Sequence, residues 1–175
     1  MARIRPIGIA FLAAVLVAIP APQSAGAPAV ERASGGFTRV LVRLHNSQRA
    51  HHGLRHLRVS TALRRAARRH ARDMVRRHYF GHVSRAGSDV VDRVAVTNYG
   101  HGAGFAVQEN LFWWSTRRSP SAVLNAWLAS APHRANVMGG RWRQVGIAAV
   151  MHSPYGGGGV TVVAVYGTSR TARKR

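Results

Sequence analysis

The stretch "QENLFW" (108–113) lies within a segment, 106–114, whose composition and alternation predict a β-strand. Successive side chains of a strand point to opposite faces, so Glu109 shares one face with three apolar residues, Val107, Leu111 and Trp113. A carboxylate on an apolar face must be paired, hydrogen-bonded or bound to a metal, because an isolated buried charge is too costly. The residues alone leave two alternatives open: an ion pair with an arginine, or a functional site.

A second stretch, "WLASAPHRANVM" (127–138), closes a predicted helix and places His133 directly after Ala131-Pro132. Ser119 caps this helix and Pro120 occupies its first position, where a missing N–H costs little. The apolar residues of the helix fall on one face: Val123, Leu124, Trp127 and Leu128. The pattern therefore predicts a core-facing helix that ends where the histidine begins.

Two further helices are predicted nearer the N-terminus. The first starts at Phe37 and is stopped by Gly53, and the second is capped by Ser60. The second has an apolar stripe: Leu63, Ala66, Ala67, His70, Ala71 and Met74. Its other faces carry arginines: Arg64, Arg65, Arg68, Arg69, Arg72, Arg76 and Arg77. We interpret His70, which lies on the stripe, as a core histidine with a hydrogen-bond partner.

Strands dominate the C-terminal part of the chain. Segments 144–152 and 160–166 are predicted strands joined through "SPYGGGG", and 88–97 is a short helix. Helices first and strands mostly later predict an α+β layered domain. The sequence contains no H-E-x-x-H, G-x-S-x-G or Walker A motif, and without cysteine it has no thiol nucleophile.

The 175-residue chain has a formal net charge of +21, and its first segment reads as an export signal. Basic residues precede an apolar core at 7–19 and small residues follow it, with cleavage predicted after Ala29 and Ser24-Ala25-Gly26 as a second candidate. A retained anchor is the alternative, although the core is short against the ~20 residues that span a bilayer. We expect a signal peptide at 1–29, a linker at 30–36, one domain at 37–168 and a basic tail at 169–175, in a protein that is secreted or associated with the cell envelope.

Five short motifs occur in an order that resembles the CAP superfamily, whose domain is also called the SCP domain. They are "LHNSQRA" (44–50), "YFGHVS" (79–84), "VVDRV" (90–94), "QENLFW" (108–113) and "HRANVM" (133–138). That superfamily includes cysteine-rich secretory proteins, insect venom allergens and pathogenesis-related plant proteins. The chain is most similar to its cysteine-free bacterial branch, over nearly all of the predicted mature chain.

The resemblance implies a three-layer α-β-α sandwich whose central cavity holds two histidines and two acids. Carried over by motif, these are His82, His133, Glu109 and Asp92, with Asp89 as the fallback acid. Asn46 and Arg49 match a family stretch on the first helix, and we interpret them as structural polar contacts. Gln108 replaces the family's usual glycine, and Ala131-Pro132 replaces the commoner Pro-Gly before the histidine.

Two imidazoles and carboxylates suit a divalent metal, zinc foremost, with His82, His133 and Glu109 as ligands. Three functions follow: a non-enzymatic binding module with a metal cavity, a metal-dependent hydrolase of peptides or cell wall, or a carrier of lipid that uses aromatics such as Trp113 and Trp114. The predicted mature charge of +19 (24 basic and 5 acidic residues) favours anionic envelope polymers or lipid headgroups as partners. An exported protein seldom meets nucleic acid, so none is expected as a physiological partner.

Overall fold

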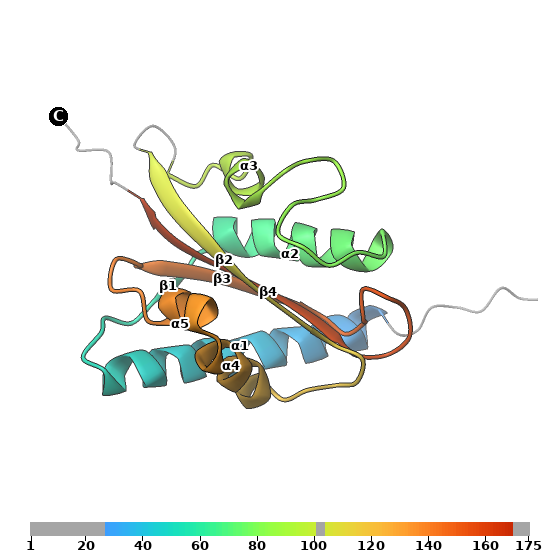
Figure 1. Ribbon diagram of the computed structural model, residues 1–175, viewed down its shortest axis with the longest axis horizontal. Helices are drawn as coiled ribbons and strands as arrows, with labels where there is room; N and C mark the ends of the chain where they lie inside the picture. Colours follow the sequence, from blue (N-terminus) through green and yellow to red (C-terminus); the bar gives the residue numbers. More distant parts are fainter. Residues whose placement is uncertain (1–26, 101–103, 170–175) are drawn as a thin grey trace, which may run out of the picture.

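The computed structural model describes residues 27–100 and 104–169, which form a sandwich of helices on both faces of one sheet (Figure 1). The sheet contains β1 (Arg58–Val59), β2 (Phe105–Trp114), β3 (Gln144–Val150) and β4 (Val160–Ser169). On one face lie α2 (Thr61–Arg76) and α3 (Val90–Ala95), and on the other lie α1 (Ala27–His51), α4 (Pro120–Ala129) and α5 (Ala131–Val137). The predicted α-β-α layering is confirmed.

The strand order is β1-β3-β4-β2, so the two long strands β2 and β4 pair along their whole length. Their antiparallel register runs from Phe105 opposite Ser169 to Trp114 opposite Val160. β4 is covered by helices on both faces, so its side chains are buried on both sides. Its sequence is therefore a nearly continuous apolar run and not an alternation of apolar and polar residues. The two-residue strand β1 pairs in parallel with β3 and was not predicted, since so short a segment leaves no periodic pattern.

Two apolar cores fill the spaces between the layers. One joins α1, α4 and α5 to the sheet around Trp127 and Trp142, and the other joins α2 and α3 to the sheet around Leu63 and Met74. The six residues of the α2 stripe are all buried, as predicted. The Ser60 side chain accepts a hydrogen bond from the Leu63 N–H, as the predicted cap requires.

Two predicted boundaries were wrong. Helix α1 begins at Ala27 and so includes 30–36, which was assigned to a linker. Its two glycines each cost about 1 kcal/mol relative to alanine, but unlike proline they do not stop a helix. The helix that Ser119 caps ends at Ala129, and a separate helix, α5, begins at Ala131. Pro132 lies in the first turn of α5, where proline is tolerated, and not in a helix interior, where it is not.

Most of the predicted signal peptide and basic tail lies outside the described residues. Of the tail, only Ser169 is described, and it is the last residue of β4. Within 27–100 and 104–169, no helix combines the length and apolar character needed to cross a membrane.

The tightest contact between layers predicts the effect of one added methyl group. A Cβ at Gly146 on β3 would lie 2.0 Å from the Arg64 backbone nitrogen of α2. Gly146→Ala should therefore cost more than about 3 kcal/mol of unfolding free energy, because backbone cannot move aside as a side chain can. Urea unfolding measures this, with Gly158→Ala as the matched control, since its Cβ would meet nothing within 4 Å. Equal stability of the two variants would contradict the packing.

Candidate functional site

The carboxylate of Glu109 is the centre of a polar cluster between β2, α2 and α3. Its side chain is 1% exposed. Arg93 Nη2 donates to both oxygens, at 3.0 Å and 3.1 Å, and His82 Nδ1 lies 3.1 Å from Oε2. His70 Nε2 lies 3.8 Å from the same oxygen. Of the two alternatives for this strand residue, the ion pair with an arginine is therefore present, and a histidine adjoins it.

Arg93 does more than neutralise Glu109. It also donates to the backbone oxygens of Ser88, at 2.7 Å, and His82, at 2.9 Å. One guanidinium thus joins the strand, the loop that carries His82 and the start of α3. Because a planar guanidinium carries five donors in a fixed fork, it suits this role better than a lysine would.

Asp92 and Asp89 do not reach the cluster. The Asp89 carboxylate caps α3 by accepting hydrogen bonds from the N–H groups of Val91 and Asp92. The Asp92 carboxylate in turn accepts from the Asp89 N–H, which completes a reciprocal capping box. Both acids are exposed. That either completes the cavity tetrad stays a prediction that these contacts do not support, because a residue at the third position of a helix turns back toward the cap. Arg93, one position on, points at Glu109 instead.

His82 and His133 approach the site from opposite sides of β2. The His82 side chain is 58% exposed, whereas His133, in the first turn of α5, is half-buried. Burial, and then the charge of His82, lower the pKa of His133. Ser130 Oγ lies 2.8 Å from His133 Nδ1. The hydroxyl therefore contacts one histidine and the carboxylate the other, so a complete Ser-His-acid relay is not formed.

A three-ligand zinc site is not formed by the residues as they lie. In the described part of the chain, no three His, Cys, Asp or Glu side chains are grouped so as to hold a metal ion. Arg93 already supplies the positive charge that Glu109 needs, and a metal would have to displace it. Zinc binding by His82, His133 and Glu109 stays a prediction that this geometry does not support.

His70 is the core histidine that its position predicted. Its Nε2 N–H donates to Gly81 O at 2.9 Å and so fixes the chain just before His82. Burial is the main cause that lowers the pKa of His70, and the Glu109 carboxylate opposes that shift. A neutral His70 therefore positions His82 without adding charge.

Behind the site runs a buried hydrogen-bond network that sequence reasoning missed, although all of its members except Tyr166 stand in the five motifs. Asn110 donates to His133 O at 3.0 Å and accepts from Asn136 at 2.8 Å. Asn110 also contacts the Tyr166 hydroxyl, which lies 2.8 Å from His45 Nε2. His45 Nδ1 donates to a carbonyl, so Nε2 must accept the proton of Tyr166. These residues tie α1, β2, β4 and α5 together beneath His133.

Asn46 and Arg49 of α1 form hydrogen bonds with backbone groups. Asn46 exchanges two hydrogen bonds with Leu57, which lies just before β1. Arg49 is fully buried and donates to the carbonyls of Arg55, Val137 and Gly139. Desolvation by burial lowers the pKa of Arg49. Both side chains thereby hold the loops that follow α1 and α5.

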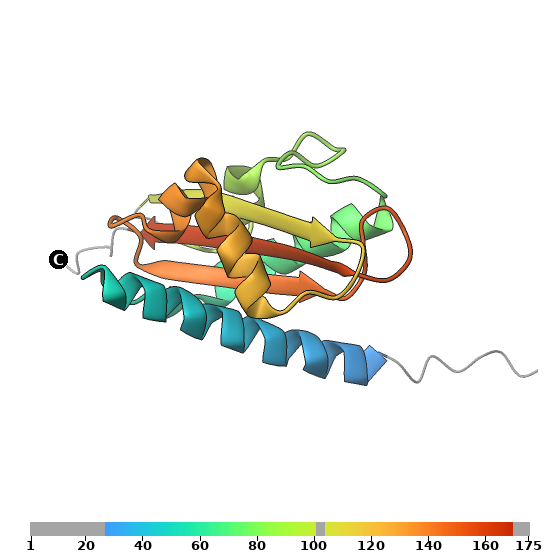
Figure 2. The ribbon, with the colours of Figure 1, turned by 60° about the horizontal axis from the view of Figure 1, so that its bottom comes forward.

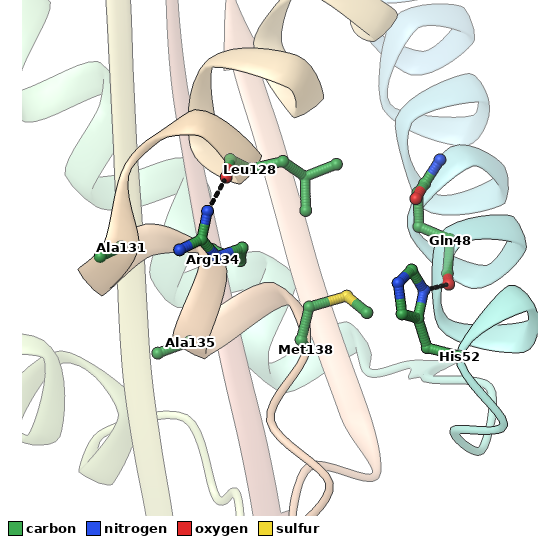
Figure 3. Close-up of a pocket in the computed structure, with 7 residues that line it drawn as sticks. All are labelled: Gln48, His52, Leu128, Ala131, Arg134, Ala135 and Met138. Atoms are coloured by element: carbon green, nitrogen blue, oxygen red, sulfur yellow. Dashed lines mark hydrogen bonds between the residues drawn. The ribbon is translucent and has the colours of Figure 1, made fainter.

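A groove lies apart from this cluster, between α1 and the α4–α5 pair (Figure 3). Its volume is about 540 Å³, and it is open to solvent. Three polar side chains line it, those of Gln48, His52 and Arg134. The other lining residues are apolar: Leu128, Ala131, Ala135 and Met138. None of the predicted tetrad residues lines it.

An α-β-α sandwich with a buried strand glutamate between two histidine-bearing segments is the arrangement of a CAP-type, or SCP, domain. The sequence profile of the "Cysteine-rich secretory protein family" matches residues 42–166, and the chain belongs to this family.

Relatives with this fold come from several bacteria. The chain is 25% identical over 114 residues to "Uncharacterized protein YkwD" of Bacillus subtilis (strain 168), covering 65% of this chain and 42% of that protein's length. An outer surface protein of Borrelia burgdorferi superposes with a TM-score of 0.67 at 18% identity, covering 77% of this chain and 94% of the other. An extracellular SCP-domain protein of Bacillus anthracis str. Ames gives 0.67 at 22%, covering 78% and 42%.

The buried network predicts a pH dependence of stability. Burial is the main cause that lowers the pKa of His45 to about 4, whereas the unfolded chain protonates near its ordinary value of 6.5. Between these values the unfolded state binds more protons, so the unfolding free energy falls as the pH is lowered. At about pH 4.5 the loss relative to about pH 7 should be roughly 2 to 3 kcal/mol from His45 alone. Urea unfolding at both pH values measures it, and His45→Gln should lack that part. A variant with unchanged pH dependence would contradict the assignment.

The ion pair of Glu109 predicts a second effect on stability. Glu109→Gln leaves the guanidinium of Arg93, which is 10% exposed, without a counter-charge. Because an uncompensated buried charge is costly, the unfolding free energy should fall by about 3 kcal/mol or more. Asp92→Asn is the matched control and should cost below about 1 kcal/mol, since it alters an exposed cap. A comparable loss in both variants would restore Asp92 to the site.

Proposed function

We propose that this chain is an exported, non-enzymatic CAP-domain protein that binds anionic polymers of the cell envelope through the outer face of α2. Two features support export: the basic and apolar series in 1–29, and similarity to proteins described as extracellular or outer-surface. Polymer binding is argued from the surface charge of the described residues.

The observation that carries the proposal is the composition of the exposed face of α2. Its six arginines and Arg77, the C-cap residue, are all exposed: Arg64, Arg65, Arg68, Arg69, Arg72, Arg76 and Arg77. They extend over about 20 Å along the helix axis. One acid, Asp73, shares the helix, and it is engaged by Arg77 at 3.0 Å and by the Tyr79 hydroxyl at 2.6 Å. Such a row suits a linear polymer of phosphate or carboxylate groups, which guanidinium binds in bidentate geometry.

The cluster around Glu109 gives less support to an enzyme. A hydrolase of the serine type needs the acid, the histidine and the hydroxyl in one chain of contacts. Here Glu109 contacts His82 while Ser130 contacts His133, and Arg93 competes for the carboxylate. The cluster instead joins β2 to the loop before α3, which is a structural role.

The proposal predicts salt-dependent binding that depends on α2. The protein should bind a poly(glycerol phosphate) chain at low salt and release it as salt rises, because each contact frees counterions. Changing Arg64, Arg65 and Arg69 together to Gln should lower the affinity about ten-fold or more and flatten the dependence of log affinity on log salt concentration. Titration by fluorescence anisotropy of labelled polymer measures both quantities.

The control triple replaces Arg39, Arg43 and Arg55 with Gln, which removes the same charge from exposed positions on or just after α1. It should retain most of the affinity. An equal loss in both triples would show that net charge alone attracts the polymer, and absence of binding at low salt would overturn the proposal.

A further inference from the structure

The end of the sandwich where β2 stops carries exposed aromatic rings that the proposed function does not use. Trp114 is 45% exposed and Tyr155, on the β3–β4 connection, is 59% exposed. Both are held by neighbouring rings: Trp114 stacks on Phe112 at 6.4 Å, and Tyr155 meets Trp113 edge-on at 5.0 Å. Because Trp113 and Trp114 point to opposite faces of the sheet, the exposed rings flank the sheet end on both sides.

Positive charge lies beside one of these rings, Trp114. The Arg118 guanidinium lies 4.4 Å from the centre of the Trp114 ring, and Arg117 beside it is exposed. The C-terminal end of α2 reaches the same region, since His78 Nδ1 donates to Pro154 O at 3.3 Å. Of the four acids whose side chains are described, Asp73 is paired, Asp89 and Asp92 cap α3, and Glu109 is bound by Arg93.

The geometry points to a bilayer with anionic headgroups as the partner of this end of the molecule. Tryptophan and tyrosine prefer the boundary between headgroups and acyl chains, where the ring is buried and the polar atom stays wet. Arginines beside them can contact headgroup phosphates. A single linear polyanion would use the arginines but would gain little from two rings on opposite faces of a sheet. A planar surface contacts both at once.

The course of the chain agrees with this orientation. Helix α1 begins at the same end of the molecule as the end of β2 and the β3–β4 connection (Figures 1 and 2). The segment with the apolar core at 7–19 is therefore joined to the domain at this end. The rings and arginines of this surface, Trp114, Tyr155, Arg117 and Arg118, all lie outside the row of arginines on α2, so the inference does not depend on polymer binding.

Vesicle binding tests the inference on the protein recovered after export. Phosphatidylcholine vesicles with phosphatidylglycerol should bind it and shift its tryptophan emission to shorter wavelength, whereas vesicles of phosphatidylcholine alone should bind it weakly. Changing Trp114 and Tyr155 to Ala should lower the vesicle affinity about ten-fold or more. Changing Arg117 and Arg118 to Gln should lower affinity for the anionic vesicles to a similar degree.

The matched control changes Arg64 and Arg65 to Gln, which removes the same charge from the other end of α2. It should keep vesicle binding, and the Trp114/Tyr155 variant should keep poly(glycerol phosphate) binding, so the two proposals fail separately. Should the alanine variant unfold, Trp114→Phe in an otherwise unchanged chain tests the same ring, because brominated lipid should quench wild-type emission more than that of the variant. Full vesicle binding without the rings, equal loss in both arginine pairs, or binding to polymer but not to anionic vesicles would overturn the inference.

Discussion

The buried carboxylate of Glu109 is the constraint around which one half of the sandwich is organised. A charge with 1% exposure needs a counter-charge and hydrogen bonds, and Arg93, His82 and the nearby His70 surround it. Because Arg93 also holds two backbone carbonyls, the requirement of one strand residue fixes the loop before α3 and the position of α3 itself. The other half depends on a neutral network, with His45 and Tyr166 at its centre.

Much of the fold followed from the sequence because it rests on periodicity and order. The stripe of α2, its Ser60 cap and the three long strands all leave patterns that depend on neighbours in the chain. Features decided by single residues or long-range contacts did not follow. The break between α4 and α5 at Ser130, the helical course of 30–36 and the strand β1 depend on local turns or on a partner far away in sequence.

The candidate site was predicted in part for the same reason. His82 and Glu109 do meet, and His133 lies close enough for the charge of His82 to lower its pKa. A second acid was expected beside Glu109 at position 92, but the side chain that reaches Glu109 is that of Arg93, the next residue. One residue along a helix turns a side chain by about 100°. Asp92 and Arg93 therefore point to the cap and to the carboxylate respectively, and no motif distinguishes them. Asn110, Asn136 and Tyr166 were missed because periodicity indicates burial but not which buried polar groups meet.

The distribution of charge links the interior to the surface. Each acid with a described side chain is engaged within the fold: one in the cluster, two in a helix cap and one with arginines of α2. Few carboxylates then remain to balance 26 basic residues, so the exposed arginines create a positive field that extends into solvent. The interior neutralises its own glutamate while the surface stays positive, and it is on this outer surface that we propose recognition. That outside has two parts with different chemistry: a row of arginines along α2, and a sheet end where arginines accompany exposed aromatic rings.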